Sequence, residues 1–98
     1  MIKLPVDFKK YGNLYHQIKR EKHKALYSVI QGDRIEGFEV IRVKVSPATE
    51  FTLSGNTVKL KEKELYPTAE QFGKMGWFYM EKANAEAKYE SLQPREQK

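Results

Sequence analysis

Apolar and polar residues alternate along much of the chain, which is the period of a β-strand with one buried face. Over residues 14–21, Leu14 and Ile18 alternate with polar neighbours, and His16 and Arg20 continue the same face. This segment is therefore predicted to be a half-buried or edge strand.

Two stronger strands are predicted next. Residues 25–30 are rich in apolar and β-branched side chains, which favours a central position. Residues 31–37 contain two glycines and an aspartate, which is the chemistry of a turn. Residues 38–45 form the strongest strand, with apolar side chains on both faces (Ile41, Val43 and Val45 on one, Phe38 and Val40 on the other). The three segments together predict an antiparallel meander.

A second hairpin is predicted around Ser54-Gly55-Asn56, after Pro47 has ended the preceding strand. The residues that flank this turn at strand spacing are apolar (Phe51, Leu53, Val58 and Leu60). Residues 61–64 alternate in charge, and they are predicted to be a solvated stretch.

The last third of the chain predicts a helical turn, a strand and a helix. Thr68 and Gln71 have the spacing of a capping box before a short turn over residues 69–72. Residues 77–80 predict a strand in which either Trp77 and Tyr79 or Phe78 and Met80 face the core. Residues 81–92 predict a helix that Pro94 stops, with one apolar stripe to lie on the sheet (Ala85, Tyr89 and Leu92).

These elements predict an α+β fold, an antiparallel sheet of four to five strands with one C-terminal helix packed on it. At 98 residues the chain fits a single domain over residues 1–98, with a frayed polar tail over residues 93–98. The chain has no cysteine, so disulfides and thiolate metal sites are excluded. The N-terminus lacks the apolar run of a signal peptide, and no apolar stretch approaches membrane-spanning length, so we expect a cytoplasmic protein without a membrane partner.

Charge is the property that changes this picture most. Residues 1–24 hold seven basic and two acidic residues, and this difference accounts for the whole net charge of +5. The densest run is residues 19–24. Such a run either binds phosphate backbones or is a solvated hairpin tip that protects a sheet edge. No helix is predicted over residues 9–24, so RNA or single-stranded nucleic acid is a more suitable target than the major groove of DNA.

The candidate binding residues follow from this charge and from the neighbouring aromatics, which can stack on unpaired bases. In the basic quarter they are Lys9, Lys10, Tyr15, Lys19, Arg20, Lys22 and Lys24. In the aromatic strand, Trp77 and Tyr79 are candidate anchors for a protein partner if they are exposed, although core packing is the default for such side chains.

Catalytic and metal signatures are absent from the sequence. His16 and His23 are too few for a metal site, and neither has an obvious carboxylate or nucleophile to work with. The glycines fit neither phosphate-binding pattern. We therefore expect a protein that is not an enzyme and that has no catalytic residues, no cofactor and no metal.

One resemblance bears on function. Residues 66–73, the aromatic run of residues 77–79 and the alanine-rich helix, together with the strand over residues 38–43, resemble small uncharacterised accessory proteins of bacteriophages and mobile elements. The resemblance covers residues 25–92 and leaves out the basic run. It implies a non-enzymatic protein that binds a host protein or ribonucleoprotein complex in the host cytoplasm, such as an anti-CRISPR-like inhibitor of an RNA-guided defence nuclease. A free-standing module for RNA or single-stranded nucleic acid is the alternative, and the oligomeric state is open.

Overall fold

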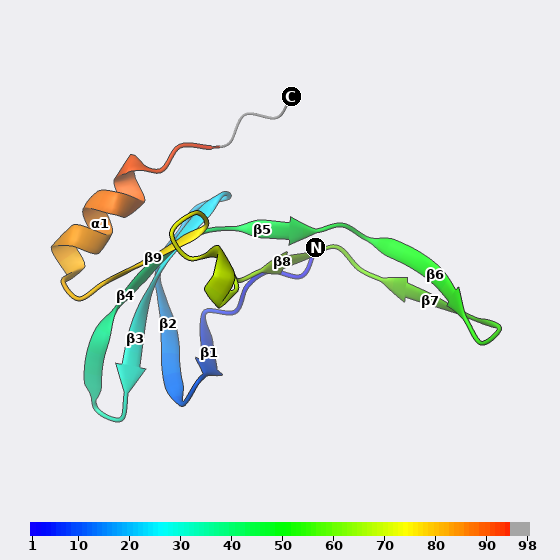
Figure 1. Cartoon of the computed structure of the whole chain (residues 1–98), viewed down its shortest axis with the longest axis horizontal. Coiled ribbons are helices and arrows are strands. Elements are labelled where there is room, and N and C mark those ends of the chain that lie inside the picture. Colours follow the sequence, from blue (N-terminus) through cyan, green and yellow to red (C-terminus); the bar gives the residue numbers. More distant parts are fainter. Residues whose placement is uncertain (95–98) are drawn as a thin grey trace.

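A five-stranded antiparallel sheet forms the body of the protein in the computed structural model, which describes residues 1–94 (Figure 1). The helix α1 packs on one face of this sheet, so the predicted α+β architecture is confirmed. The strands lie in the order β1 (Asp7–Lys10), β2 (Asn13–Arg20), β3 (Lys24–Gln31), β4 (Arg34–Arg42) and β9 (Gly76–Tyr79), and α1 covers Lys82–Ser91. Of the predicted polar tail, residues 95–98 lie outside the described residues.

The meander β2–β3–β4 is the predicted one, with a tighter turn. Gly32 has a positive φ of 62°, and the chain returns at once, so that residues 34–37 belong to β4 rather than to the turn. The strand β3 is buried on both faces because helix α1 covers one and the N-terminal segment and Tyr66 cover the other. The strand β1, which was not predicted, extends the sheet beyond β2.

The helix side of the sheet holds one half of the core. Leu26 and Val40 are fully buried beneath Ala85 and Tyr89 of α1. Leu92 belongs to the same cluster, so all three residues of the predicted apolar stripe are buried against the sheet. The helix α1 turns small and aromatic side chains toward the sheet and charged side chains toward solvent. A helix of ten residues is marginal by itself, so this packing on the sheet is what stabilises it.

The opposite side holds an aromatic cluster. Phe8 stacks on Tyr15 with 4.8 Å between the ring centroids, and the ring of Tyr66 meets Phe8, Tyr15 and Tyr27 edge-on. The hydroxyl of Tyr66 donates a hydrogen bond of 2.6 Å to Oε1 of Glu39. This pairing leaves a carboxylate in a largely apolar setting, and burial raises the pKa of Glu39.

A β-bulge in β2 corrects the predicted faces of that strand. The register with β3 shifts between Gln17 and Lys19. Ile18 and Lys19 consequently both face helix α1, and Arg20 turns to the other side of the sheet, where it meets Glu64. The prediction that Arg20 shares a face with Ile18 is wrong because strict alternation does not survive the extra residue.

The predicted strand over residues 38–45 is also divided. It leaves the sheet after Arg42, and residues 44–46 pair elsewhere. They form β5 (Lys44–Ser46), which pairs with β8 (Lys63–Leu65), and β6 (Thr49–Leu53) pairs with β7 (Asn56–Leu60) as the predicted hairpin. The mixed-charge stretch is therefore partly strand, and Glu64 within it is buried rather than solvated.

One register runs through both of these ladders. The two residue numbers of each pair have the same sum from Lys44 with Leu65 through Thr49 with Leu60 to Leu53 with Asn56. The segment is thus a single long ribbon that is interrupted around Pro47. We call its outer part, β6 and β7, the arm. Figure 1 shows the arm projecting from the body, which makes the molecule 51 Å long and only 22 Å deep.

The strand β9 forms the edge of the sheet next to β4, and a short helical turn precedes it. The predicted turn is a 3-10 helix over Ala69–Gln71, with the capping box of Thr68 and Gln71 formed. In β9, Phe78 lies across Gly37 of β4. A Cβ at Gly37 would overlap the ring of Phe78 and would lie 2.9 Å from the carbonyl oxygen of Tyr79. Gly37 is therefore needed for the close approach of these two strands.

Candidate functional site

The basic run over residues 19–24 is largely engaged in contacts within the protein. Lys24 is only 5% exposed, and its Nζ donates to the carbonyl oxygens of Tyr89, at 2.6 Å, and Leu92, at 3.4 Å. These are carbonyls at the C-terminal end of α1, which carries a partial negative charge. The same Nζ lies 4.3 Å from the centroid of the Tyr89 ring. Lys24 thus anchors the helix to the sheet and is not available to a partner.

Lys19 and Arg20 are paired as well. Nζ of Lys19 lies 3.1 Å from a carboxylate oxygen of Glu86 and 3.7 Å from one of Glu90. Arg20 forms an ion pair with the buried carboxylate of Glu64. Burial by itself would raise the pKa of Glu64, but the hydrogen bonds from Arg20 and from the backbone of Leu4 hold that pKa below its usual value. Both cations are therefore paired within the fold.

The other basic candidates are divided between open and occupied positions. Lys9 and Lys22 are exposed, and neither has an ion-pair partner among residues 1–94. Nζ of Lys10 lies 5.0 Å from the ring centroid of Tyr66, where it covers the aromatic cluster. Tyr15 is buried within that cluster, so its ring cannot stack on a base.

The exposed residues of the aromatic strand are not the predicted anchors. Trp77 and Tyr79 pack against the core beside α1, and Nζ of Lys88 covers the Trp77 ring at 4.2 Å. Phe78 and Met80 are the exposed pair, at 48% and 79%. The core thus takes the first of the two predicted pairs, and Phe78 is the only exposed aromatic residue of β9.

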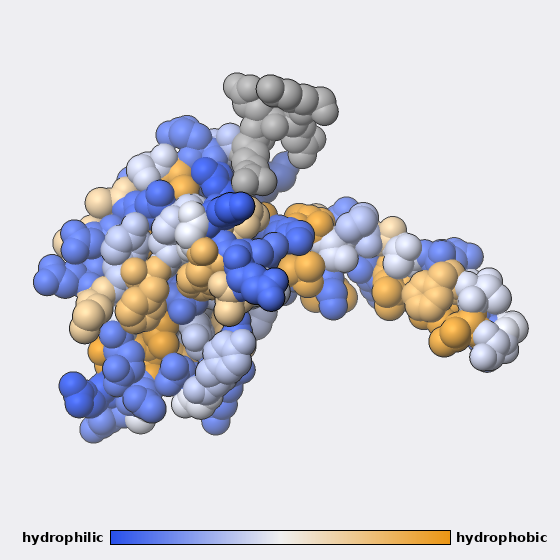
Figure 2. Space-filling model, in the orientation of Figure 1, coloured by the Kyte–Doolittle hydropathy of each residue, from blue (hydrophilic) through white to orange (hydrophobic). Residues whose placement is uncertain are grey.

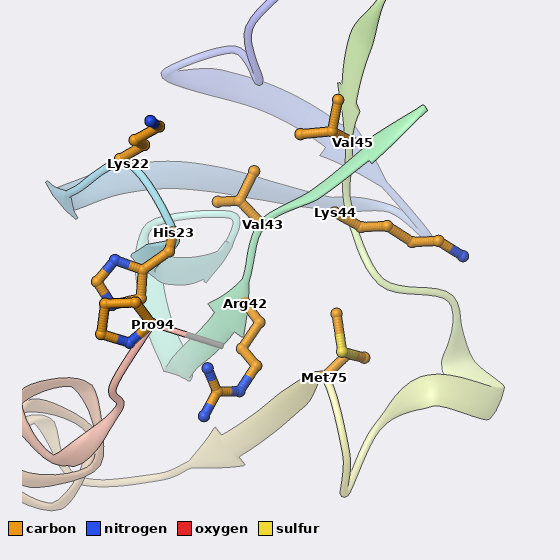
Figure 3. A pocket seen from close by; sticks show the side chains of 8 residues that line it. All are labelled: Lys22, His23, Arg42, Val43, Lys44, Val45, Met75 and Pro94. Carbon is orange, nitrogen blue, oxygen red and sulfur yellow. The ribbon is translucent and has the colours of Figure 1, made fainter. Parts of the chain in front are cut away.

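A basic groove lies where the loop between β2 and β3 approaches the start of the ribbon. It encloses about 560 Å³. Four of its lining residues are basic or imidazole side chains and the others are apolar (Lys22, His23, Arg42 and Lys44, with Val43, Val45, Met75 and Pro94). Figure 3 shows Arg42 pointing into the space between Pro94 and Met75, with the amines of Lys22 and Lys44 on opposite sides of it.

Backbone hydrogen bonds bring these distant segments together. The N–H of Val43 donates to the carbonyl oxygen of His23 at 2.9 Å, and the N–H of Arg42 donates to that of Met75 at 2.8 Å. The Arg42 guanidinium donates to the carbonyl oxygen of Gln93 at 2.6 Å. The groove is therefore a junction at which four parts of the chain meet.

The groove has the chemistry of an anion site. No acidic residue lines it, and its apolar wall reduces the local dielectric, which strengthens the attraction of cations for an anion. Nε2 of His23 is buried there without a hydrogen-bond partner in the described part of the chain. Lys22 was a predicted site residue. Arg42 and Lys44 were not, because their even spacing in a β-rich segment looked like the polar face of a strand.

The groove continues into a second hollow. Lys44 also lines this hollow, together with Met75, the half-buried Gln71 and the exposed Glu70 and Lys74. The two hollows place Lys22, Arg42, Lys44 and Lys74 along one path, which we call the basic track. A path of this kind is longer than a single small anion needs.

Other kinds of site are less well supported. Residues 1–94 contain no group of three histidine, aspartate or glutamate side chains placed to hold a metal ion. Within the same residues, no helix has the length and apolar character required to cross a bilayer. Comparison with other proteins adds no assignment, since no family model, curated protein or solved structure matches this chain.

Proposed function

We propose that this chain is a non-enzymatic binding protein that takes an anionic segment of a macromolecule along the basic track. The observation that carries the proposal is the groove of Lys22, His23, Arg42 and Lys44, which has an apolar wall and no acidic lining residue. Cations in such a setting favour phosphate or carboxylate oxygens.

A polyanion suits the track better than a small ligand does. The cations lie in two adjoining hollows and come from three separate parts of the chain. The backbone of RNA or of single-stranded DNA presents phosphates in series, and an extended strand can follow a shallow groove that a double helix cannot enter. Phe78, although exposed, lines neither hollow and is not needed for this contact.

The specific form of the proposal is a phage-type accessory protein that inhibits a host ribonucleoprotein, such as an RNA-guided defence nuclease. Its support is the resemblance of residues 25–92 to accessory proteins of bacteriophages, together with a groove suited to a phosphate backbone. In such a complex the track would contact the guide or the target strand, and the remaining surface would contact the protein part of the nuclease. The alternative is a free-standing nucleic-acid module that uses the same track.

Binding to a labelled single-stranded RNA, followed by fluorescence anisotropy over a range of salt concentrations, tests the track. The variant K22Q/K44Q/K74Q removes three exposed charges that line it, and K59Q/K61Q/K82Q removes three exposed charges elsewhere. We expect the first variant to reduce the slope of log affinity against log salt by about 0.7 per lysine, because each lysine releases counterions from a single strand. The second should leave the slope within error of the unmodified protein.

Equal losses in both variants would contradict a localised track, since they would show attraction to net charge alone. The two forms of the proposal are separated by a pull-down from the host with the tagged full chain. An inhibitor is expected to retain one complex in stoichiometric amount and to lose it in K22Q/K44Q/K74Q. Tight RNA binding by the free protein, with no retained complex, would instead support the module.

A further inference from the structure

The arm has one apolar face and one polar face. Directly paired residues of an antiparallel ladder lie on the same face, and so do residues two apart along a strand. One face of the arm therefore holds four apolar side chains and two uncharged polar ones (Phe51, Leu53, Val58 and Leu60, with Thr49 and Asn56). The other face holds the pair Glu50 and Lys59 and the pair Thr52 and Thr57.

Nothing within residues 1–94 covers the apolar face. Phe51 is 44% exposed, Leu60 52% and Leu53 62%. The strands β6 and β7 pack substantially only on each other, and Figure 2 shows hydrophobic side chains along the arm. A two-stranded hairpin without further packing is at best marginally stable in water. An exposed apolar face on such an element is the mark of an interface.

We propose that the arm packs face to face on the arm of a second copy of this chain. This inference goes beyond the proposed function and does not depend on it. The face carries no charge, so two copies can meet without burying an unpaired ion. The charged residues of the arm all lie on its opposite face, where they remain in solvent when the apolar faces meet.

The middle row of the arm is suited to a two-fold axis. Phe51 and Val58 form the middle row of the apolar face, Leu53 lies toward the tip, and Leu60 lies toward the base. An axis along the middle row, between the two faces, lays the arms antiparallel with β6 over β6 and β7 over β7. Phe51 and Val58 then each meet the same residue of the second copy, whereas Leu53 lies over its Thr49 and Leu60 over its Asn56, so every facing side chain is uncharged. The bodies then lie at opposite ends, so the projecting shape of the arm allows the contact. A two-fold interface of this type is self-complementary.

The size of the face sets the strength of the association. The face has six residues per copy, four of them apolar, so the interface is smaller than a standard specific contact. We therefore expect a dimer that forms and dissociates in the micromolar range. Because each copy carries a net charge of +5, added salt should strengthen this dimer by screening repulsion. Polyanion binding by the basic track has the opposite salt dependence.

Sedimentation velocity of the full chain from about 5 to 500 µM, where a small interface dissociates, measures the association. The variant F51E places a charge on the apolar face, and the matched control T52E places the same charge on the next residue, which faces the other way. We expect F51E to be monomeric throughout and T52E to dimerise like the unmodified protein. A monomer at every concentration would overturn the proposal, as would equal behaviour of the two variants.

Disulfide trapping locates the contact independently of affinity. The chain has no cysteine, so a single introduced cysteine can form a disulfide only with the same cysteine of a second copy. V58C lies in the middle row beside the proposed axis, and T57C lies on the opposite face. Under mild oxidation we expect V58C to form a covalent dimer several times faster than T57C. Equal rates would show that the copies do not meet on this face and would overturn the proposal.

Discussion

At the scale of single residues, the structure separates the charges that hold the fold from those that remain available. Lys24 is buried against the end of α1, whereas Lys22, two residues earlier, is exposed and lines the groove. The sequence places them in one basic run. Only the tertiary contacts distinguish them, because the carbonyls that bind Lys24 belong to residues 65 and 68 positions away.

Gly37 carries the first prediction. We expect G37A to lower the free energy of unfolding by about 1–3 kcal/mol, since the added methyl overlaps the ring of Phe78. Urea denaturation measures this loss. The double variant G37A/F78A removes part of the overlap, so the two changes should couple favourably. Strict additivity would show that the ring does not restrict this site.

Glu39 carries a prediction about pH. Burial raises its pKa above the ordinary value of 4.5, so the native state holds this proton more tightly than the unfolded chain does. The free energy of unfolding should therefore fall as the pH rises from 4.5 through the raised pKa.

The variant E39Q should lack this pH dependence and be more stable than the unmodified protein at neutral pH. Its amide oxygen can still accept from the Tyr66 hydroxyl. Thermal unfolding across this pH range is the measurement, and E50Q on the exposed arm is the control. If E39Q and E50Q gave parallel curves, ionisation of Glu39 would have no part in the pH dependence.

At the scale of elements, the ion pair of Arg20 and Glu64 ties the base of the ribbon to the sheet. Glu64 also accepts a hydrogen bond of 3.0 Å from the backbone N–H of Leu4, so one carboxylate joins three segments. Its partners and its lowered pKa indicate that it is ionised in the folded protein.

We expect E64A to cost roughly 3 kcal/mol, because it leaves Arg20 partly buried without its partner. The amide hydrogen of Leu4 should also exchange faster, and hydrogen-exchange mass spectrometry can follow the N-terminal segment. E62A, just before β8, is the control. A small change in stability with no change in exchange would mean that Arg20 finds another partner.

The elements also show how far periodicity can predict this fold. The meander, the arm, the capped turn and α1 were predicted because each has a strong local pattern. The short strands β1 and β8 were missed, since three or four residues are too few to show a period, and β5 was predicted only as the end of the strand over residues 38–45. The bulge in β2 was missed because one inserted residue changes the face of Arg20 without changing the composition. The groove was missed for a related reason, since Lys22, Met75 and the segment of residues 42–44 meet only through tertiary contacts.

At the scale of the whole molecule, the arm is structurally separate from the body. The Cα radius of gyration is 15.6 Å, whereas a compact domain of this length would have about 12.5 Å. The two core clusters lie entirely in the body and include no residue of the arm. The body therefore provides the hydrophobic core, and the arm provides the elongated shape.

Replacing residues 49–60 by a short glycine-rich turn should test this separation. We expect the midpoint of thermal unfolding to change by no more than about 4 °C, the shift that 1 kcal/mol gives in a small domain. Small-angle scattering at low concentration should show the radius of gyration falling toward the compact value. A large loss of stability would instead mean that the arm supports the body.

The constant register of the ribbon has a consequence for how its length can change over evolutionary time. One residue added to each strand near the base would turn every outer side chain to the opposite face and present Glu50 and Lys59 where Phe51 and Val58 now lie. A residue added to one strand alone would create a bulge. Only two residues in each strand would lengthen the arm and keep its apolar side, so related chains that conserve this side should differ in arm length by multiples of four residues.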